Sequence, residues 1–303
     1  MEKIGNVKMD YTFYKGSDEY CDGTIEQEIL EYVKQYDDEM EILKKDDRWP
    51  VLYHISPVRK NILEWYEFKN DADVLEVGAG CGAVTGAICE KVRTVTSVDL
   101  SKQRSMINAY RNKKYDNLNI LVANFNDIVF EKKYDYITLI GVLEYAAYYT
   151  ATDNPFVDFL KRLKGTLKED GKLLIAIENK FGLKYWSGCV EDHTGRYYDG
   201  IMGYVDTQSK VKTFSKNELM QIIEDAGFRK YQFYYPFPDY KFAQQIFSDD
   251  YLPSKNELVC QTKTYDNDRF LMFNETLAYD NIIASNKFDF FANSYFIEIE
   301  NEW

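Results

Sequence analysis

The chain has 303 residues, of which 45% are hydrophobic and 29% are charged, enough for one domain with appendages and a sizeable core. Its formal net charge of −13 argues against nucleic-acid partners, because such binding depends on Lys and Arg that neutralise phosphates. No apolar run is long enough to span a membrane, and the N-terminus lacks the pattern of a signal peptide. We therefore expect a cytoplasmic protein that does not span a membrane.

The first 70 residues predict an N-terminal helical cap. Apolar residues recur at helical spacing over 24–45, which predicts a first helix. Ser56-Pro57 predicts the start of a second helix, with Ser as the N-cap and Pro at the first helical position. No strand is predicted before Asp73.

From Asp73 onward, strand-like segments alternate with helical ones. The predicted strands cover 73–77, 94–98, 118–122, 134–140, 171–177 and 228–235, and the predicted helices cover 83–91, 101–114, 154–168 and 215–226. Ser215 and Glu218 have the spacing of a capping box. The alternation predicts an α/β fold with a Rossmann-like, doubly wound and mostly parallel sheet. A last strand fits either 242–247 or 258–264, and the residues alone do not choose between them.

Two segments interrupt this alternation. Residues 178–212 separate a strand from its helix and are longer than an ordinary connection, so they form an insertion within a core of 71–250. Residues 251–303 are aromatic and irregular, and we expect a C-terminal extension there. It stops soon after the strand-like segment 295–299, which is compatible with continuation into a further module.

The strongest local signal is Glu76-Val77-Gly78-Ala79-Gly80-Cys81-Gly82, where an apolar strand runs into three alternate glycines and then a helix. Glycines permit positive φ and a close approach of backbone to a ligand, which in such sheets binds beyond the carboxyl ends of the strands. Glu76 would repel a pyrophosphate but suits the cationic methionine part of S-adenosylmethionine. Asp99 suits the ribose hydroxyls of either S-adenosylmethionine or a dinucleotide. A glycine turn without a ligand is the remaining alternative.

Residues 73–235 resemble the class I S-adenosylmethionine-dependent methyltransferases. The resemblance rests on the glycine segment, on Val98-Asp99-Leu100-Ser101, and on 123–127, 134–137 and 141–145. It implies a seven-stranded sheet and S-adenosylmethionine as the cofactor. The cofactor-binding residues that it implies are Glu76, Gly78, Ala79, Gly80, Gly82, Asp99, Leu100, Asn124, Phe125 and Gly141. Asn124 stands where the family usually has an Asp that contacts the adenine amino group, and Phe125 is expected near the adenine.

The insertion is expected to bind the methyl acceptor, because it leaves the carboxyl end of the fifth predicted strand. Residues 178–204 contain six aromatic side chains and five Gly. Aromatic rings pack on the C–H faces of sugars, and carboxylates and amides bind hydroxyls, so a saccharide is favoured over a flat apolar acceptor. An Ω-loop packed by its own aromatic residues is the alternative. The predicted acceptor-binding residues are Tyr145, Glu178, Asn179, Tyr185, Trp186, Asp192 and Arg196.

His193 is the candidate catalytic residue. Methyl transfer to a hydroxyl benefits from a base that removes the proton, and His is the side chain that titrates near neutral pH. Acceptor binding and a purely structural role stay open for His193. Glu191 is its neighbour in sequence, which does not by itself imply contact. No group of residues has the spacing of metal ligands, so no metal site is predicted, although scattered carboxylates could assemble one.

A narrower resemblance involves 177–186, 191–195 and 199–204. These segments are similar to methyltransferase modules of bacterial surface-polysaccharide synthesis, some of which belong to longer chains. The similarity implies O-methylation of a sugar or glycan hydroxyl. The alternatives are a small metabolite or other acceptor, a non-catalytic scaffold in a larger synthase, and an NAD-dependent sugar enzyme. The last would need Tyr-x-x-x-Lys after the fourth or fifth strand, whereas Tyr110 and Lys114 follow the second.

Overall fold

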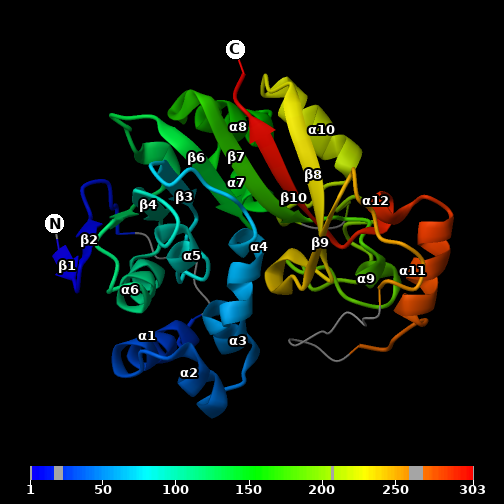
Figure 1. Cartoon of the computed structure of the whole chain (residues 1–303), viewed down its shortest axis with the longest axis horizontal. Coiled ribbons are helices and arrows are strands. Elements are labelled where there is room, and N and C mark those ends of the chain that lie inside the picture. Colours follow the sequence, from blue (N-terminus) through cyan, green and yellow to red (C-terminus); the bar gives the residue numbers. More distant parts are fainter. Residues whose placement is uncertain (1, 17–22, 206–207, 259–268, 303) are drawn as a thin grey trace. The chain divides into compact units, whose positions relative to one another are not determined.

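The computed structural model describes residues 2–16, 23–205, 208–258 and 269–302 (Figure 1). The chain divides into two compact units. Unit 1 comprises Met1–Ile140 and Thr166–Leu173, and unit 2 comprises Gly141–Gly165 and Leu174–Trp303. In the described ranges, no helix combines the length and the apolar character needed to cross a membrane.

Unit 1 contains a mostly parallel sheet in the order β1-β2-β5-β4-β3-β6. The strands are β1 Glu2–Ile4, β2 Val7–Asp10, β3 Asp73–Val77, β4 Thr94–Asp99, β5 Leu118–Val122 and β6 Tyr134–Ile140. All neighbours from β2 to β6 run parallel, and only β1 is antiparallel to its neighbour. The chain passes from β3 outward to β5 and then returns to β6 on the other side of β3. The strand order thus reverses beside β3, the position at which such sheets bind ligands.

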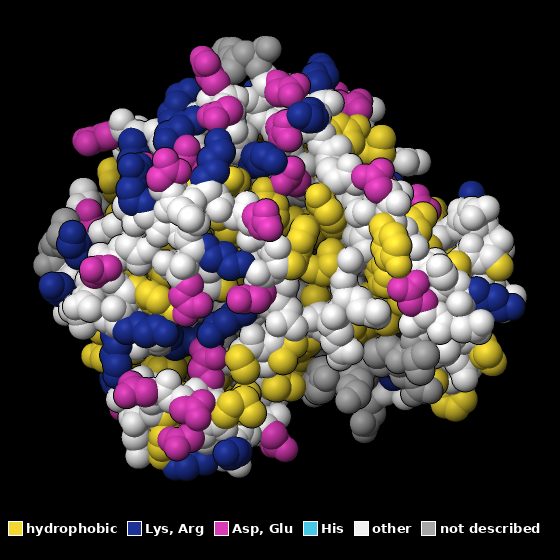
Figure 2. All heavy atoms as spheres, viewed as in Figure 1, with side chains coloured by type: hydrophobic (Ala, Val, Ile, Leu, Met, Phe, Trp, Pro, Cys, Tyr) yellow, Lys and Arg dark blue, Asp and Glu magenta, His cyan; other side chains and the backbone are white. Residues whose placement is uncertain are grey.

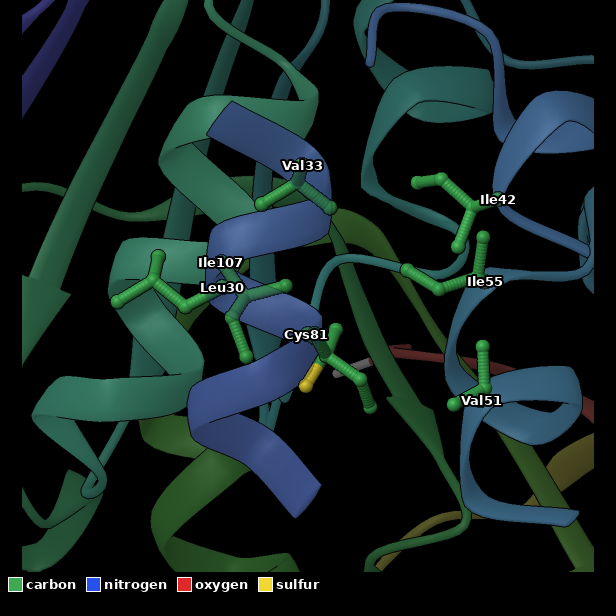
Figure 3. Packing of buried hydrophobic residues seen from close by; sticks show 8 residues of the cluster. Leu30, Val33, Ile42, Val51, Ile55, Cys81 and Ile107 are labelled. Atoms are coloured by element: carbon green, nitrogen blue, oxygen red, sulfur yellow. The ribbon is translucent and has the colours of Figure 1, made fainter. Parts of the chain in front are cut away.

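The helices of unit 1 are α1 Ile25–Gln35, α2 Glu39–Lys45, α3 Trp49–Ile55, η1 Pro57–Lys60, α4 Asn61–Glu64, α5 Thr85–Cys89, α6 Lys102–Arg111 and η2 Phe125–Asp127. Residues of α1, α2, α3 and α6 form one apolar cluster with Cys81, which lies in the segment that follows β3. Figure 3 shows Leu30 of α1, Ile107 of α6 and Val51 of α3 around Cys81. The N-terminal helices therefore bury one side of the glycine segment in a shared apolar core.

The N-terminal segment differs from its prediction in two ways. The expectation of no strand before Asp73 is wrong, because β1 and β2 form a hairpin with Gly5 at φ +58° in its turn. Strands this short carry too few residues for a two-residue hydrophobic period to appear. The single helix predicted over 24–45 is two helices, because the Asp38 side chain accepts a hydrogen bond from the Met40 N–H and caps α2.

Unit 2 contains strands in the order β7-β10-β8-β9. These are β7 Leu167–Glu178, within which the unit boundary falls, β8 Lys230–Phe237, β9 Gln245–Ser248 and β10 Ser294–Glu300. β8 is antiparallel to both β10 and β9. The helices are η3 Leu143–Tyr145, α7 Ala146–Tyr149, α8 Pro155–Thr166, α9 Leu183–Trp186, α10 Lys216–Asp225, η4 Tyr240–Phe242, α11 Glu275–Ala284 and α12 Phe288–Phe291. The capping box predicted at Ser215 is confirmed.

The α/β class is confirmed, and the strand count is larger than predicted. The described residues form ten strands where seven were expected; β1 and β2 end the order of unit 1, and β9 ends that of unit 2. The strand between β7 and β8 is β10, near the chain's end, and neither predicted last strand takes that place. Of those two, 242–247 overlaps β9, and 258–264 lies outside the described residues except for Leu258, which is in no strand. The domain boundaries at 70/71 and 250/251 stay predictions.

Candidate active site

The glycine segment after β3 adopts the conformation that its sequence predicts. Gly78, Gly80 and Gly82 have φ values of +70°, +52° and +76°. The N–H groups of Gly78 and Ala79 donate to the Val98 carbonyl of β4 at 2.8 and 3.1 Å. A Cβ atom at Gly80 would meet no other atom within 4 Å, so open space lies beside this backbone. A Cβ at Gly82 would lie 2.4 Å from the Asn108 side-chain oxygen, so Gly82 serves close packing against α6.

Asp99 closes this turn from the end of β4. Its two carboxylate oxygens accept hydrogen bonds from the backbone N–H groups of Gly80 at 2.7 Å and of Ser101 at 2.9 Å. Burial raises the pKa of Asp99 above its usual value, although these N–H groups act in the opposite direction. Each oxygen keeps a lone pair, so the carboxylate can still accept a hydrogen bond from a hydroxyl group.

Glu76 is the buried acidic residue of β3. One oxygen, Oε2, accepts hydrogen bonds from the hydroxyls of Thr85, at 2.7 Å, and of Ser97. The other, Oε1, is buried and has no hydrogen-bond partner among the described residues. Burial raises the pKa of Glu76 to about 7. A buried carboxylate with one unsatisfied oxygen is suited to a cationic hydrogen-bond donor.

Leu100 follows β4, which neighbours β3, and Asn124 and Phe125 follow β5, the next strand outward. β4 and β5 are paired in parallel, with Asp99 opposite Val122, so their following residues emerge at one edge of the sheet. The side-chain oxygen of Asn124 accepts a hydrogen bond from the Asn126 N–H at 2.9 Å, which caps η2. Phe125 is buried with its ring 5.5 Å from that of Phe130, so its ring is already packed within the protein.

Unit 2 assembles a second group of functional side chains, here called the polar cluster. It consists of Glu144, Glu178, Lys184, Glu191, Asp192, His193, Asp239 and Lys241. These residues come from η3, the end of β7, α9, the insertion and η4 with its N-cap. No His side chain shows on the face in Figure 2, in keeping with the burial of both His residues.

His193 lies between two carboxylates. Its Nδ1 is 3.0 Å from Glu191 Oε1, and its Nε2 is 3.7 Å from Glu144 Oε1. The second oxygen of Glu191 accepts from the backbone N–H groups of His193 and Thr194 at 2.8 and 2.7 Å, which fixes that carboxylate. Burial alone would lower the pKa of His193, but Glu144 and Glu191 raise it well above its usual value. The imidazole must therefore lose a proton before it can act as a base.

Two lysines that sequence reasoning missed balance part of this negative charge. Lys184 Nζ is 2.7 Å from Asp239 and 2.9 Å from Asp192. Lys241 Nζ is 2.7 Å from Asp192 and also pairs with Glu178. Lys184 stands among aromatic residues of the insertion, which is a weak sequence signal for a place in the polar cluster. Nothing near Lys241 in the sequence indicates that it belongs to the cluster.

Only some of the predicted acceptor-binding residues lie in or beside the polar cluster. Glu178, Asp192 and His193 belong to the polar cluster, Tyr185 donates to Asp192 at 2.5 Å, and the Tyr145 ring lies 5.4 Å from the imidazole. Trp186 and Arg196 are exposed.

Two other predicted residues have a structural task. The Asn179 amide donates to the carbonyls of Phe290 and Ala292 at 2.7 and 2.8 Å, which ties the insertion to the C-terminal extension. Gly141, predicted to bind the cofactor, has φ +70°, and a Cβ there would lie 2.6 Å from the Tyr240 hydroxyl. Gly141 therefore allows close packing of a tyrosine.

Comparison with known proteins identifies the family. The sequence profile of a family described as a methyltransferase domain matches residues 52–232, more than half of the chain. The chain belongs to this methyltransferase family. It is an S-adenosylmethionine-dependent methyltransferase with a Rossmann-like α/β fold, as the resemblance of the glycine segment implied. The open space at Gly80 and the unsatisfied oxygen of Glu76 fit this cofactor.

Several relatives are similar to parts of the methyltransferase. An uncharacterised methyltransferase of Staphylococcus carnosus is 29% identical over 155 residues, covering 51% of this chain and 69% of the relative. A ribosomal RNA small subunit methyltransferase A of Syntrophus aciditrophicus is 31% identical over 84 residues, 28% of each protein. The structure of a phosphoethanolamine N-methyltransferase of Haemonchus contortus has a TM-score of 0.50 at 14% identity, covering 92% of this chain and 49% of that chain. This last likeness concerns the fold alone.

Proposed function

We propose that the methyltransferase transfers a methyl group to a hydroxyl of a sugar or glycan, in the synthesis of a bacterial surface polysaccharide. The observation that carries this proposal is the polar cluster of unit 2, where the Tyr185 hydroxyl contacts the Asp192 carboxylate and the Tyr145 ring lies beside the His193 imidazole. Carboxylates accept hydrogen bonds from hydroxyl groups, and aromatic rings pack on the apolar faces of sugars. A cytoplasmic location and an association with other modules of a polysaccharide-synthesis protein belong to the same proposal.

The cofactor is assigned to the glycine segment of unit 1. Glu76 would hold the ammonium group of the methionine part through its unsatisfied oxygen. Asp99 would accept the ribose hydroxyls, and Gly80 would give room for the backbone to approach the ligand. S-adenosylmethionine supplies a methyl group that is already activated by the sulfonium. The protein therefore contributes mainly orientation of the acceptor and exclusion of water.

His193 is proposed as the base that takes the hydroxyl proton. Its Nε2 is the nitrogen that faces Glu144, while Nδ1 is held by Glu191. The two carboxylates favour the protonated imidazole, so this role requires that His193 first release its proton to water and then take the proton of the acceptor hydroxyl. Acceptor binding by a protonated His193 is the alternative role.

The direct test is a transfer assay with S-adenosylmethionine carrying an isotope-labelled methyl group. The acceptor panel should contain free sugars, nucleotide-linked sugars, oligosaccharides, primary amines and small carboxylic acids. We expect label only in saccharides, and NMR of the product should place the methyl carbon on oxygen. Label in an amine alone would refute the sugar hydroxyl.

Cofactor binding separates the remaining outcomes. Calorimetric titration with S-adenosylhomocysteine should show saturable binding, and the same titration with NAD should not. If S-adenosylhomocysteine binds but no acceptor is methylated, the fold serves as a scaffold and the proposed transfer is wrong. Glu31→Gln, which alters an exposed carboxylate of α1, is the matched control for charge changes in both assays.

A further inference from the structure

A site for a divalent cation lies within the polar cluster. Glu144, Glu178 and His193 each offer one ligand atom, and these three atoms lie within 4.8 Å of one another. Ligand atoms at about 2.1 Å from one ion stand roughly 3–4 Å apart, so a contraction of about 1 Å would bring all three to an ion. The three residues come from η3, the end of β7 and the insertion, so the fold has to bring them together.

The free atoms of this site point to a ligand. Glu144 Oε2 and Glu178 Oε2 are both buried and have no hydrogen-bond partner within the described part of the chain. The exposed fraction of each side chain is at most 1%. Buried carboxylate oxygens are normally hydrogen-bonded or coordinate a metal, because their desolvation is costly. These two carboxylates and the His193 ring together form an incomplete coordination shell.

His193 has the orientation of a metal-binding histidine. A histidine that binds a metal through one nitrogen usually donates its other ring N–H to a carboxylate, which fixes the tautomer and the ring. Here Nδ1 is 3.0 Å from Glu191 Oε1. Glu191 is itself held by Tyr204, whose hydroxyl donates to the same oxygen at 3.2 Å. Nε2 is then the nitrogen that faces Glu144.

The charges of the cluster also favour a cation. It contains five carboxylates and two lysines. The lysines both contact Asp192, and their other partners are Asp239 and Glu178. The carboxylates exceed the ammonium groups by three, and Glu144 has no lysine partner among the described residues. A doubly charged ion would remove most of this excess without adding another side chain.

We propose that Glu144, Glu178 and His193 bind one divalent transition-metal ion, with Glu191 as the residue that positions His193. The mixed set of one nitrogen and two carboxylate oxygens favours Mn²⁺, Fe²⁺ or Zn²⁺ over Mg²⁺, which prefers oxygen ligands. In the metal-loaded protein His193 is a ligand, and this role replaces the role of base that is proposed above. An ion at this place could take hydroxyl groups of an acceptor as further ligands and lower their pKa.

The test uses the full chain, freed of metal by EDTA and dialysis. Mn²⁺ is titrated while its free electron-paramagnetic-resonance signal is recorded, and Zn²⁺ and Mg²⁺ are titrated by calorimetry. We expect one Mn²⁺ per chain and weaker binding of Mg²⁺. At a hundredfold excess over Kd, Mn²⁺ should raise Tm by about 5 °C.

Variants decide whether the bound ion lies at this site. Glu144→Gln and His193→Ala should each weaken Mn²⁺ binding at least tenfold, and Glu191→Gln should weaken it about 10- to 100-fold. Glu31→Gln should bind as the wild type does. Glu144→Gln is the decisive variant, because Glu178→Gln also removes one of the two carboxylates that Lys241 contacts and could impair folding.

Two results would overturn this inference: no saturable binding of Mn²⁺ or Zn²⁺ by the folded wild type, or equal affinity in the wild type and Glu144→Gln. The titration with S-adenosylhomocysteine keeps the two proposals apart. Intact S-adenosylhomocysteine binding and sugar methylation in EDTA would refute a catalytic metal while leaving the proposed sugar methylation untouched.

Discussion

The glycine segment of unit 1 and the polar cluster of unit 2, the two proposed binding sites, are built by opposite means. The glycine segment uses backbone conformation, with three positive φ values and one buried carboxylate that keeps a free oxygen. The polar cluster uses side chains from distant segments, and its carboxylates are held by lysines, an imidazole and backbone N–H groups. A site of the first kind depends on a few residues that have no substitute. A site of the second kind depends on charge balance, so a single substitution there should also disturb the contacts of neighbouring side chains.

The largest effect on rate is expected at His193. His193→Ala removes either the proposed base or the proposed metal ligand, and methyl transfer should slow by about 10²–10⁴-fold. The affinity for S-adenosylhomocysteine should stay within about twofold of the wild type, because the proposed cofactor contacts of Glu76, Gly80 and Asp99 lie in unit 1. Transfer rates under saturating cofactor, with calorimetry in parallel, make this comparison. A variant with full activity would remove His193 from the chemistry.

Glycine substitutions test the backbone side of the comparison. Gly82→Ala combines a positive φ with a Cβ placed 2.4 Å from Asn108, so it should cost about 2–4 kcal/mol of stability. Gly80→Ala meets no atom and should cost only about 1–2 kcal/mol. Urea unfolding of both variants measures the difference. Equal losses would mean that packing against α6 contributes nothing.

Gly80→Ala should still weaken cofactor binding, although its loss of stability is the smaller of the two. The added methyl group enters the open space that the cofactor is proposed to use, so the affinity for S-adenosylhomocysteine should fall. Calorimetry of the folded variant checks this effect. Unchanged affinity would show that the open space beside Gly80 is not part of the cofactor site.

Glu76 should make cofactor affinity depend on pH. Burial raises its pKa to about 7, and the proposed contact with the ammonium group needs the carboxylate form. Affinity for S-adenosylhomocysteine should therefore rise as pH increases toward about 7 and level off above it, with a slope below pH 7 approaching tenfold per pH unit. Glu76→Gln should lose this slope and bind about 10- to 100-fold more weakly at pH 8. A flat profile for the wild type would refute the assigned contact.

These two regions also differ in how far the sequence predicts them. The glycine segment is contiguous, and the backbone conformation that its glycines permit can be inferred without knowledge of the rest of the fold. His193 and Asp192 stood out within the insertion because of their composition. Lys241 did not, because only folding brings η4 to Asp192 across 49 positions of sequence. The segment 295–299 was recognised as strand-like and lies within β10, but its place in the sheet was missed for a similar reason, since its neighbours β7 and β8 come much earlier in the chain.

The smallest predicted effect concerns a helix cap outside both sites. Ser215 caps α10 through the N–H of Glu218, and the Glu218 side chain accepts from the Ser215 N–H in return. Ser215→Ala should cost about 1 kcal/mol of stability, because one N–H group at the helix start loses its partner. Cofactor affinity and Mn²⁺ binding should not change. If either does change, the start of α10 helps to position the insertion that precedes it, and the polar cluster extends further along the chain than its charged contacts indicate.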